Sequence, residues 1–392
     1  MESFSIDCGV LPASVSISRF RGQDGVDEYH VMVRPTDYGS FSAQLEWLSA
    51  AYQNALDALE LDAQSTVLRR FFCSDLSNQT AALEARPFSN PSDPDTPCAV
   101  SWTRQPPGGS AKVALWAYHL TDPESDLDKT LAASAVTLRR GALAHHWTTG
   151  RTSTNQDLPY DQTRGILESY DAILQAHSMS LAHNVVRTWF FVQNIDSNYS
   201  GFVAARREFF AQHGLTPDTH FVASTGVDGA HADTAAKVAM DAYAISGIRP
   251  EQIAFLAAPE HLSPTQLYGV TFERGTSVAY RDRKHVFISG TASIDHQGRI
   301  LYPGNVSRQL DRTLENIDAL LKSAGSDFKD MCMFIVYVRD ASDYEFARQR
   351  MRELFGDTPL QVVVAPVCRP GWLIEVEGIA IVPASNPELP AF

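Results

Sequence analysis

Long apolar runs, cysteine motifs and clusters of basic residues are all missing from this chain of 392 residues. No apolar stretch approaches the ~20 residues that a membrane-spanning helix needs, so we expect no membrane partner. The five cysteines are scattered and form no Cys-x-x-Cys pair, which argues against a disulfide framework and a zinc site. The 32 basic residues stand against 46 acidic ones and form no run, so the net charge of −14 argues against nucleic-acid partners.

Signals for export, metals and phosphate-bearing cofactors are also absent. The N-terminus carries neither a basic segment nor an apolar signal core, so the prediction is a protein of a reducing compartment, the cytoplasm. The 12 histidines show no His-x-x-x-His or Glu-x-x-His spacing, and neither a Gly-rich phosphate loop nor a Gly-x-Ser-x-Gly turn occurs. We therefore expect no metal, no cofactor and no serine-hydrolase chemistry.

What the chain does contain is an internal repeat. Residues 236–245 are identical to residues 111–120 at six of ten positions, and residues 372–381 form a weaker third copy. Upstream of each copy lie an amphipathic helix and an apolar run rich in β-branched and aromatic residues, typical of a covered strand. These helices are predicted over 45–59, 166–174 and 310–321, the strands over 67–73, 185–192 and 331–338, and second helices over 203–212 and 344–355.

The repeat predicts an α+β fold built from three tandem units of about 100 residues. The expected units are residues 1–140, the most degenerate copy, 141–250 and 251–392, with linkers over 120–139 and 248–283. Each unit alone would be an open sheet with helices on one face. Three such sheets can close side by side into a pseudo-trimer, with the sheets inside and the helices outside.

The third copy resembles a known family. Its residues Val286–Ala292, Tyr337–Asp340 and Ile374–Val376, together with Gln309 and Tyr344, are similar to those of the reactive-intermediate (enamine/imine, or RidA-type) deaminases. The resemblance implies chorismate-mutase-like α+β units, which form trimers in that family. Three copies in one chain would imitate such a trimer, so a monomer would already contain the trimer-type interfaces.

A closer resemblance is to one branch, the chorismatases, which are also called chorismate hydrolases or 3-hydroxybenzoate synthases. Residues 269–275, 289–295 and 365–375 carry it, and the last stretch, Ala-Pro-Val-Cys-Arg-Pro-Gly-Trp-Leu-Ile-Glu, is long and specific. The resemblance implies a small-molecule substrate, chorismate, cleaved to pyruvate and 3-hydroxybenzoate. The ordinary deaminases have an arginine where this chain has Gln361, which argues against the deaminase interpretation.

Glu375 is the predicted acid. Cleavage of an enolpyruvyl ether requires protonation of the vinyl methylene carbon, and the acid must therefore hold its proton near neutral pH. Glu375 lies in the apolar strand Trp372–Val376, whereas the aligned positions in the other copies are Ala239 and Ala114. Periodicity alone favours a solvent-facing glutamate beside Glu377. The resemblance reverses that preference and implies a catalytic role.

The same resemblance implies roles for two neighbouring positions. Cys368 is similar to the cysteine of the branch that makes 3-hydroxybenzoate, where the capturing hydroxyl comes from the substrate and not from water. Its alternative is a small buried apolar residue. Gly275 matches the small position that distinguishes product types in the family.

The two carboxylates of chorismate need cationic or hydroxyl partners, with arginine preferred for its two-pronged geometry. Arg187 interrupts an apolar strand and faces either solvent or an anion. Tyr243 is either a hydroxyl donor or a core aromatic residue. Arg274 and Arg369 are further candidates, although Arg369 equally suits a strand cap. In a pseudo-trimer, Arg187 and Tyr243 would come from one unit and Glu375 from its neighbour, so the site would lie in a cleft between units.

Other interpretations remain open from the sequence. Water could capture the cation and give a 3,4-dihydroxycyclohexadiene carboxylate. The protein could also be an imine/enamine deaminase, or a binding protein that holds a small carboxylate without chemistry. Ser224–Gly226, which the sequence aligns with Pro366–Cys368, either lines the cleft or forms a turn.

Overall fold

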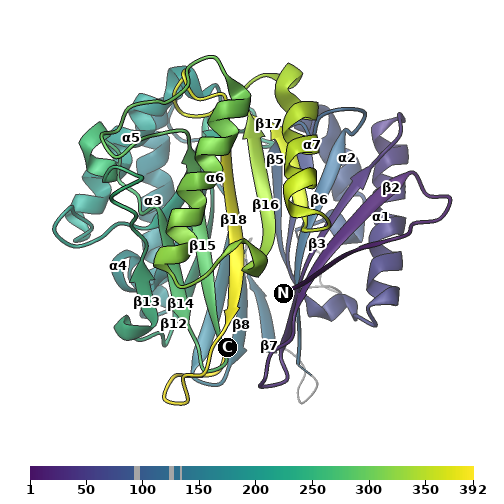
Figure 1. The fold of residues 1–392 in the computed structure, drawn as a ribbon, viewed down its shortest axis with the longest axis horizontal. Helices are drawn as coiled ribbons and strands as arrows, with labels where there is room; N and C mark the ends of the chain where they lie inside the picture. The colour runs from purple at the N-terminus through teal and green to yellow at the C-terminus, as the bar shows by residue number, and fades with distance from the viewer. Residues whose placement is uncertain (92–97, 123–127, 133–134) are drawn as a thin grey trace.

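The computed structural model describes residues 1–91, 98–122, 128–132 and 135–392, which form three consecutive six-stranded sheets with the same strand order (Figure 1). Counted in each sheet from the edge strand that comes first in the chain, the orders are β1-β2-β3-β6-β4-β5, β7-β8-β9-β12-β10-β11 and β13-β14-β15-β18-β16-β17. The strands are β1 (Glu2–Ile6), β2 (Ala13–Phe20), β3 (Asp27–Pro35), β4 (Thr66–Cys73), β5 (Ala99–Arg104), β6 (Val113–Thr121), β7 (Asp128–Ala132), β8 (Ala135–Arg140), β9 (Leu143–Arg151), β10 (Val185–Val192), β11 (Ala223–Asp228), β12 (Val238–Ser246), β13 (Ile253–Phe255), β14 (Gly275–Ala279), β15 (Arg283–Ala292), β16 (Met331–Val338), β17 (Leu360–Val364) and β18 (Ile374–Pro383).

Helices cover the outer faces of the sheets, and the strands meet in the middle of the molecule (Figure 1). The helices are α1 (Phe41–Ala58), α2 (Leu76–Glu84), α3 (Pro159–Ala176), α4 (Leu181–Asn184), α5 (Ile195–Gln212), α6 (Val306–Ser323) and α7 (Tyr344–Phe355). In α6, Asn305 caps the first turn by accepting from the Arg308 amide, and the buried stripe through Leu310 and Ile317 faces the sheet. The predicted α+β pseudo-trimer, with its sheets inside and its helices outside, is confirmed.

One apolar core spans all three sheets. It includes Trp116 of β6, Trp189 of β10 and Phe334 of β16, all at most 2% exposed. The rings of Trp116 and Trp189 lie edge to face, 6.4 Å apart between centroids. The three units therefore share one hydrophobic core and are not independent domains joined by linkers.

The register of the strands confirms the sequence alignment of the repeats. β4, β10 and β16 are each eight residues long, and each has one register shift near its start. The partners across these strands place Glu375, Ala239 and Ala114 at equivalent positions of β18, β12 and β6. The carboxyl of Glu375 is therefore a feature of one unit only.

The two predicted linkers are wrong, because both contain strands. The hairpin of β7 and β8 lies within 120–139 and extends the second sheet beside β9, although residues 123–127 and 133–134 lie outside the described residues. Within 248–283, β13 and β14 extend the third sheet beside β15. The sheets thus divide the chain between β6 and β7, earlier than the expected limit at residue 140. Short edge strands with half-exposed side chains lack the apolar runs by which the longer strands were found.

Candidate active site

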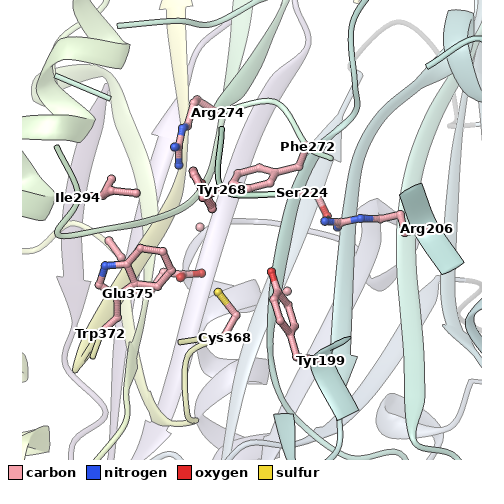
Figure 2. Close-up of a pocket in the computed structure, with 13 residues that line it drawn as sticks. Tyr199, Arg206, Ser224, Tyr268, Phe272, Arg274, Ile294, Cys368, Trp372 and Glu375 are labelled. Carbon is pink, nitrogen blue, oxygen red and sulfur yellow. The ribbon is translucent and has the colours of Figure 1, made fainter. Parts of the chain in front are cut away.

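A cavity lies between the second and third units. The second unit contributes α5 and β11, and the third contributes β15, β18 and the loops before β14 and β18 (Figure 2). It is lined by Tyr199, Arg206, Ser224, Gly226, Tyr268, Phe272, Arg274, Gly290, Ala292, Ile294, Cys368, Trp372 and Glu375. Three of the predicted site residues, Glu375, Cys368 and Arg274, therefore share one cavity.

Glu375 is buried in the wall of this cavity, with 5% of its surface exposed. Burial, and next the charge of Glu377, raise the pKa of Glu375 to about 8, while Arg274 and Arg187 act in the opposite direction. The carboxyl lies over Gly290 of β15, where any side chain would collide with it. Glu375 is therefore protonated at neutral pH and held in a space that only glycine leaves open.

Glu377 lies on the same face of β18 as Glu375 and has four donors around its carboxylate. It accepts from Arg187 Nη2 at 2.6 Å, from Trp189 Nε1 and Tyr337 Oη at 3.0 Å each, and from Thr225 Oγ1. This arrangement keeps a negative charge two residues from Glu375. Glu375 and Glu377 are similarly buried, but only Glu377 is surrounded by a full set of hydrogen-bond donors.

Arg187 is the partner of Glu377 and does not line the cavity. It is 2% exposed, stacks on Trp189 at 4.8 Å and donates to both Glu377 and Thr225. From the sequence, we expect Arg187 to face either solvent or an anion. In the structure its anionic partner is Glu377, a carboxylate of the neighbouring unit. Arg187 therefore contacts Glu377 and not the cavity.

Cys368 and Tyr199 face each other on the side of the cavity opposite Arg274 (Figure 2). Burial, and next the nearby Glu375, raise the pKa of the Cys368 thiol to about 12. Burial also raises the pKa of the Tyr199 hydroxyl well above its ordinary value. Both groups are therefore neutral proton donors at neutral pH, and a thiolate nucleophile is not available.

Two buried arginines, Arg206 and Arg274, reach toward the cavity from different units (Figure 2). Arg206 stacks on Phe202 at 4.7 Å and donates weakly to Ser224 Oγ at 3.5 Å, while Arg274 donates to the Ser263 carbonyl at 2.9 Å. The Nε of each has no partner, and neither forms an ion pair with any residue that the structure describes. Unpaired buried guanidinium groups are costly, and this cavity therefore has two positive groups without a counter-ion among the described residues.

The remaining predicted residues lie outside this cavity. Tyr243 lines a separate cavity near the pseudo-threefold axis, where its hydroxyl hydrogen-bonds His145 Nδ1 at 2.7 Å and its ring stacks on Trp147. Its expected place beside Glu375 is wrong, because residue 243 lies far along β12 from the cleft. The core-aromatic alternative is the one the structure bears out.

Gly275 and Arg369 lie next to the cavity and contact residues around it. A side chain at Gly275 would meet the Phe287 carbonyl at 2.7 Å and Leu256 at 2.9 Å, so glycine permits close strand packing there. Arg369 lies over the rings of Tyr268 at 4.6 Å and Trp372 at 5.4 Å and donates to the Tyr268 carbonyl. Neither residue lines the space itself.

Sequence reasoning missed Arg206 and Tyr199, both on α5. The sequence spacing could have indicated that Arg206 is buried. Arg206 lies four residues after Phe202 and four before Phe210, and therefore on the apolar face of the helix. Ser224 and Gly226 do line the cleft, which resolves that alternative. Their alignment with Pro366–Cys368 was wrong, because the strand registers make Thr225 equivalent to Gln361.

The described residues contain neither a candidate metal-binding cluster nor a helix suited to span a membrane. In that part of the chain, no three His, Cys, Asp or Glu side chains are grouped so that they could hold a metal ion. None of its helices combines the length and the apolar character needed to cross a bilayer.

The fold and the site define a class of protein in which three tandem α+β units enclose one acid-bearing cleft. A solved chorismatase structure shares this fold, with a TM-score of 0.61, 16% sequence identity, and coverage of 81% of this chain and 93% of that chain. The family model Endoribonuclease L-PSP matches residues 275–382.

The chain belongs to the RutC family. It is 31% identical over 106 residues to a RutC family protein of Pyrococcus abyssi, a match that covers 26% of this chain and 84% of the relative. It is also 28% identical over 107 residues to the mouse 2-iminobutanoate/2-iminopropanoate deaminase, covering 27% of this chain and 79% of that protein.

Proposed function

We propose that the protein is a chorismatase, which cleaves chorismate and releases pyruvate. The observation that carries this proposal is a neutral carboxyl, Glu375, facing one cavity with two unpaired arginines, Arg206 and Arg274. An enol ether that bears two carboxylates requires this combination of a protonated acid and two cations. The likeness to a chorismatase in fold is consistent with the proposal.

In the proposed reaction, Glu375 donates its proton to the methylene carbon of the enolpyruvyl group. The carbon–carbon double bond supplies the electron pair, and the ether oxygen stabilises the resulting cation. A ring hydroxyl of the substrate captures that cation and loses its proton, and one of the two ring carbon–oxygen bonds then breaks, so that its oxygen leaves as the ketone oxygen of pyruvate. The ring loses one proton and becomes aromatic. Of the two protons released, one stays on the phenol oxygen and the other restores the Glu375 carboxyl. Arg206 and Arg274 hold the substrate carboxylates so that the methylene carbon lies against the acid.

We further propose that the ring product is 3-hydroxybenzoate. Cys368 is neutral and faces Tyr199, so this part of the wall offers proton donors but no base to activate water. Capture by a hydroxyl of the substrate needs no added water, and pyruvate plus 3-hydroxybenzoate together contain all the atoms of chorismate.

Incubation of the purified protein with chorismate tests the function. We expect equal amounts of pyruvate and 3-hydroxybenzoate, identified by mass spectrometry and chromatography. A 3,4-dihydroxycyclohexadiene carboxylate in place of 3-hydroxybenzoate would contradict the product but not the enol-ether cleavage. Absence of pyruvate would contradict the cleavage itself.

A deaminase activity is the second candidate, and one observation favours it: a relative carries the name 2-iminobutanoate/2-iminopropanoate deaminase. Gln361, which stands where the ordinary deaminases have arginine, lies outside the acid-bearing cavity in the cleft between the third and first units. Generating 2-iminopropanoate in the presence of the protein and measuring ammonia release decides between the two candidates.

Replacing Arg206 by alanine should raise KM for chorismate about 10- to 100-fold, because one charge-assisted contact to a carboxylate is lost. Arg207→Ala is the matched control, since Arg207 is the exposed neighbour on the same helix. Steady-state kinetics of pyruvate release measures both variants. Equal KM values for the two would show that Arg206 does not hold the substrate.

A further inference from the structure

A second cleft lies between the third and first units. Helix α7 and strand β17 form one wall, and strands β2 and β3 form the other. It is lined by Ser14, Ser16, Met32, Arg34, Tyr344, Arg348, Arg352, Leu360, Gln361 and Val362. The acid-bearing cavity described above is formed by the corresponding elements of the second and third units.

The two clefts correspond position by position. The strand registers make Leu360 and Val362 equivalent to Ser224 and Gly226, both of which line the acid-bearing cavity. On the helices, Arg352 lies as far beyond the end of β16 as Arg206 lies beyond the end of β10. The buried arginine of the first cleft thus has a counterpart in the second.

The strands of the first unit complete the correspondence. The pairing of β3 with β6 and of β15 with β18 makes Met32 equivalent to Gly290. Two residues further along these strands, Arg34 takes the place of Ala292, so the second cleft gains a cation there. At the position of Glu375 stands Ala114, and the second cleft therefore has cations but no acid.

Neither Arg34 nor Arg352 forms a close ion pair with a carboxylate among the residues that the structure describes, although Asp357 interacts with the charge of Arg352 and Glu345 with that of Arg34. Arg34 donates to the Gly108 carbonyl at 3.1 Å and lies over the Tyr344 ring at 5.7 Å, and its buried Nε has no partner. Arg352 donates to the Gly356 carbonyl at 2.9 Å, to the Thr358 carbonyl at 3.3 Å and, across the cleft, to Ser16 Oγ at 3.5 Å. Burial lowers the pKa of Arg352, while the charge of Asp357 acts in the opposite direction.

The third arginine of this cleft is already neutralised. Arg348 forms an ion pair with Glu345 at 2.6 Å. No carboxylate belongs to the described lining of the cleft. Two guanidinium groups without an ion-pair partner in the cleft therefore face a space that has an apolar wall, formed by Met32, Leu360 and Val362 together with the ring of Tyr344.

We infer that this second cleft binds a small organic carboxylate and leaves it chemically unchanged. The paired prongs of Arg34 and Arg352 suit a carboxylate, and the apolar wall suits an organic body such as an aromatic ring. Chemistry of the kind proposed for the first cleft is excluded here, because Ala114 supplies no proton. This inference does not rest on the proposed function, since it concerns binding at a different pair of units.

Isothermal titration of the full chain with benzoate tests the inference. Arg352→Gln and Arg34→Gln remove one charge from each wall of the second cleft, and Arg206→Gln alters the first cleft. Arg350→Gln is the matched control, because Arg350 lies on the same helix but is 39% exposed and pairs with Asp311. Thermal unfolding of each variant verifies that it is folded.

We expect a benzoate-binding step that is at least tenfold weaker in Arg352→Gln and in Arg34→Gln but is unchanged in Arg206→Gln and Arg350→Gln. A further step that only Arg206→Gln weakens belongs to the first cleft. Should one of the two cleft variants fail to fold, the other still decides the matter. Binding that is lost only in Arg206→Gln, or no binding to the unaltered chain, would overturn the inference. Binding of inorganic phosphate but not benzoate at the second cleft would also overturn it.

Discussion

Glu375→Gln should reduce the rate of pyruvate release from chorismate by about 10³-fold or more while the protein stays folded. The amide has nearly the shape of the neutral carboxyl but cannot give its proton to carbon, and general acid catalysis contributes about 10² to 10⁴-fold. Stopped assays coupled to lactate dehydrogenase measure the residual rate. Glu388→Gln, a change of the same kind at an exposed position, is the control.

The pH dependence provides an independent measurement of the same carboxyl. Since the pKa of Glu375 is raised to about 8, kcat/KM should be level near neutral pH and fall tenfold per pH unit above about pH 8. A rate that instead falls above pH 5, or turnover by Glu375→Gln within tenfold of the unaltered protein, would refute the role of Glu375 as the acid.

Glu375→Gln and Glu377→Gln should change stability in opposite directions, although the two residues lie on the same face of one strand. The pKa of Glu375 is about 8 in the folded protein and about 4.5 in the unfolded chain, so folding at pH 7 requires the uptake of a proton. This uptake costs about 3 kcal/mol at about 1.4 kcal/mol per pH unit. Glu375→Gln removes that cost and should raise the free energy of unfolding.

The sign of the pH effect follows from the raised pKa. The contribution of Glu375 to the stability of the unaltered protein is fully present below about pH 4.5. It is lost progressively as the pH rises toward 8, because Glu375 ionises at lower pH in the unfolded chain than in the folded protein. The advantage of Glu375→Gln should therefore be about 3 kcal/mol at pH 7 and vanish near pH 4. Urea denaturation at the two pH values measures it.

Glu377→Gln should instead lower the free energy of unfolding by about 3–5 kcal/mol, because Arg187 would keep a buried charge without its partner. The ion pair between them has a length of 2.6 Å, and both side chains are at most 3% exposed. Urea denaturation at pH 7 compares the two variants directly. Stability changes of the same sign in both would contradict the assignment of one neutral and one charged carboxyl.

The repeat made much of this fold predictable. Helix and strand periodicity within residues 166–192 and 310–338 reflects local burial on one face, and the structure confirms those elements. The edge hairpins were missed because their side chains are half exposed and carry no strong pattern. Their place is decided by backbone pairing with strands that follow later in the chain.

The site divides in a similar way between what was foreseen and what was not. Glu375 and Cys368 lie within one contiguous motif, so a sequence comparison can find them together. Arg187 could not be assigned, since its partner Glu377 lies 190 residues away and meets it only across the contact between two units. Arg206 carries no motif, and its importance follows from having no ionic partner at its place in the folded chain.

By itself, the sequence determined that the chain folds as three similar units and that a single unit carries the acid, because repeats and periodicity are properties of neighbouring residues. Only the tertiary structure decided which arginines are already neutralised and which face a cavity. The energy of a buried charge depends on the groups that surround it in space, and in this protein those groups come from different units.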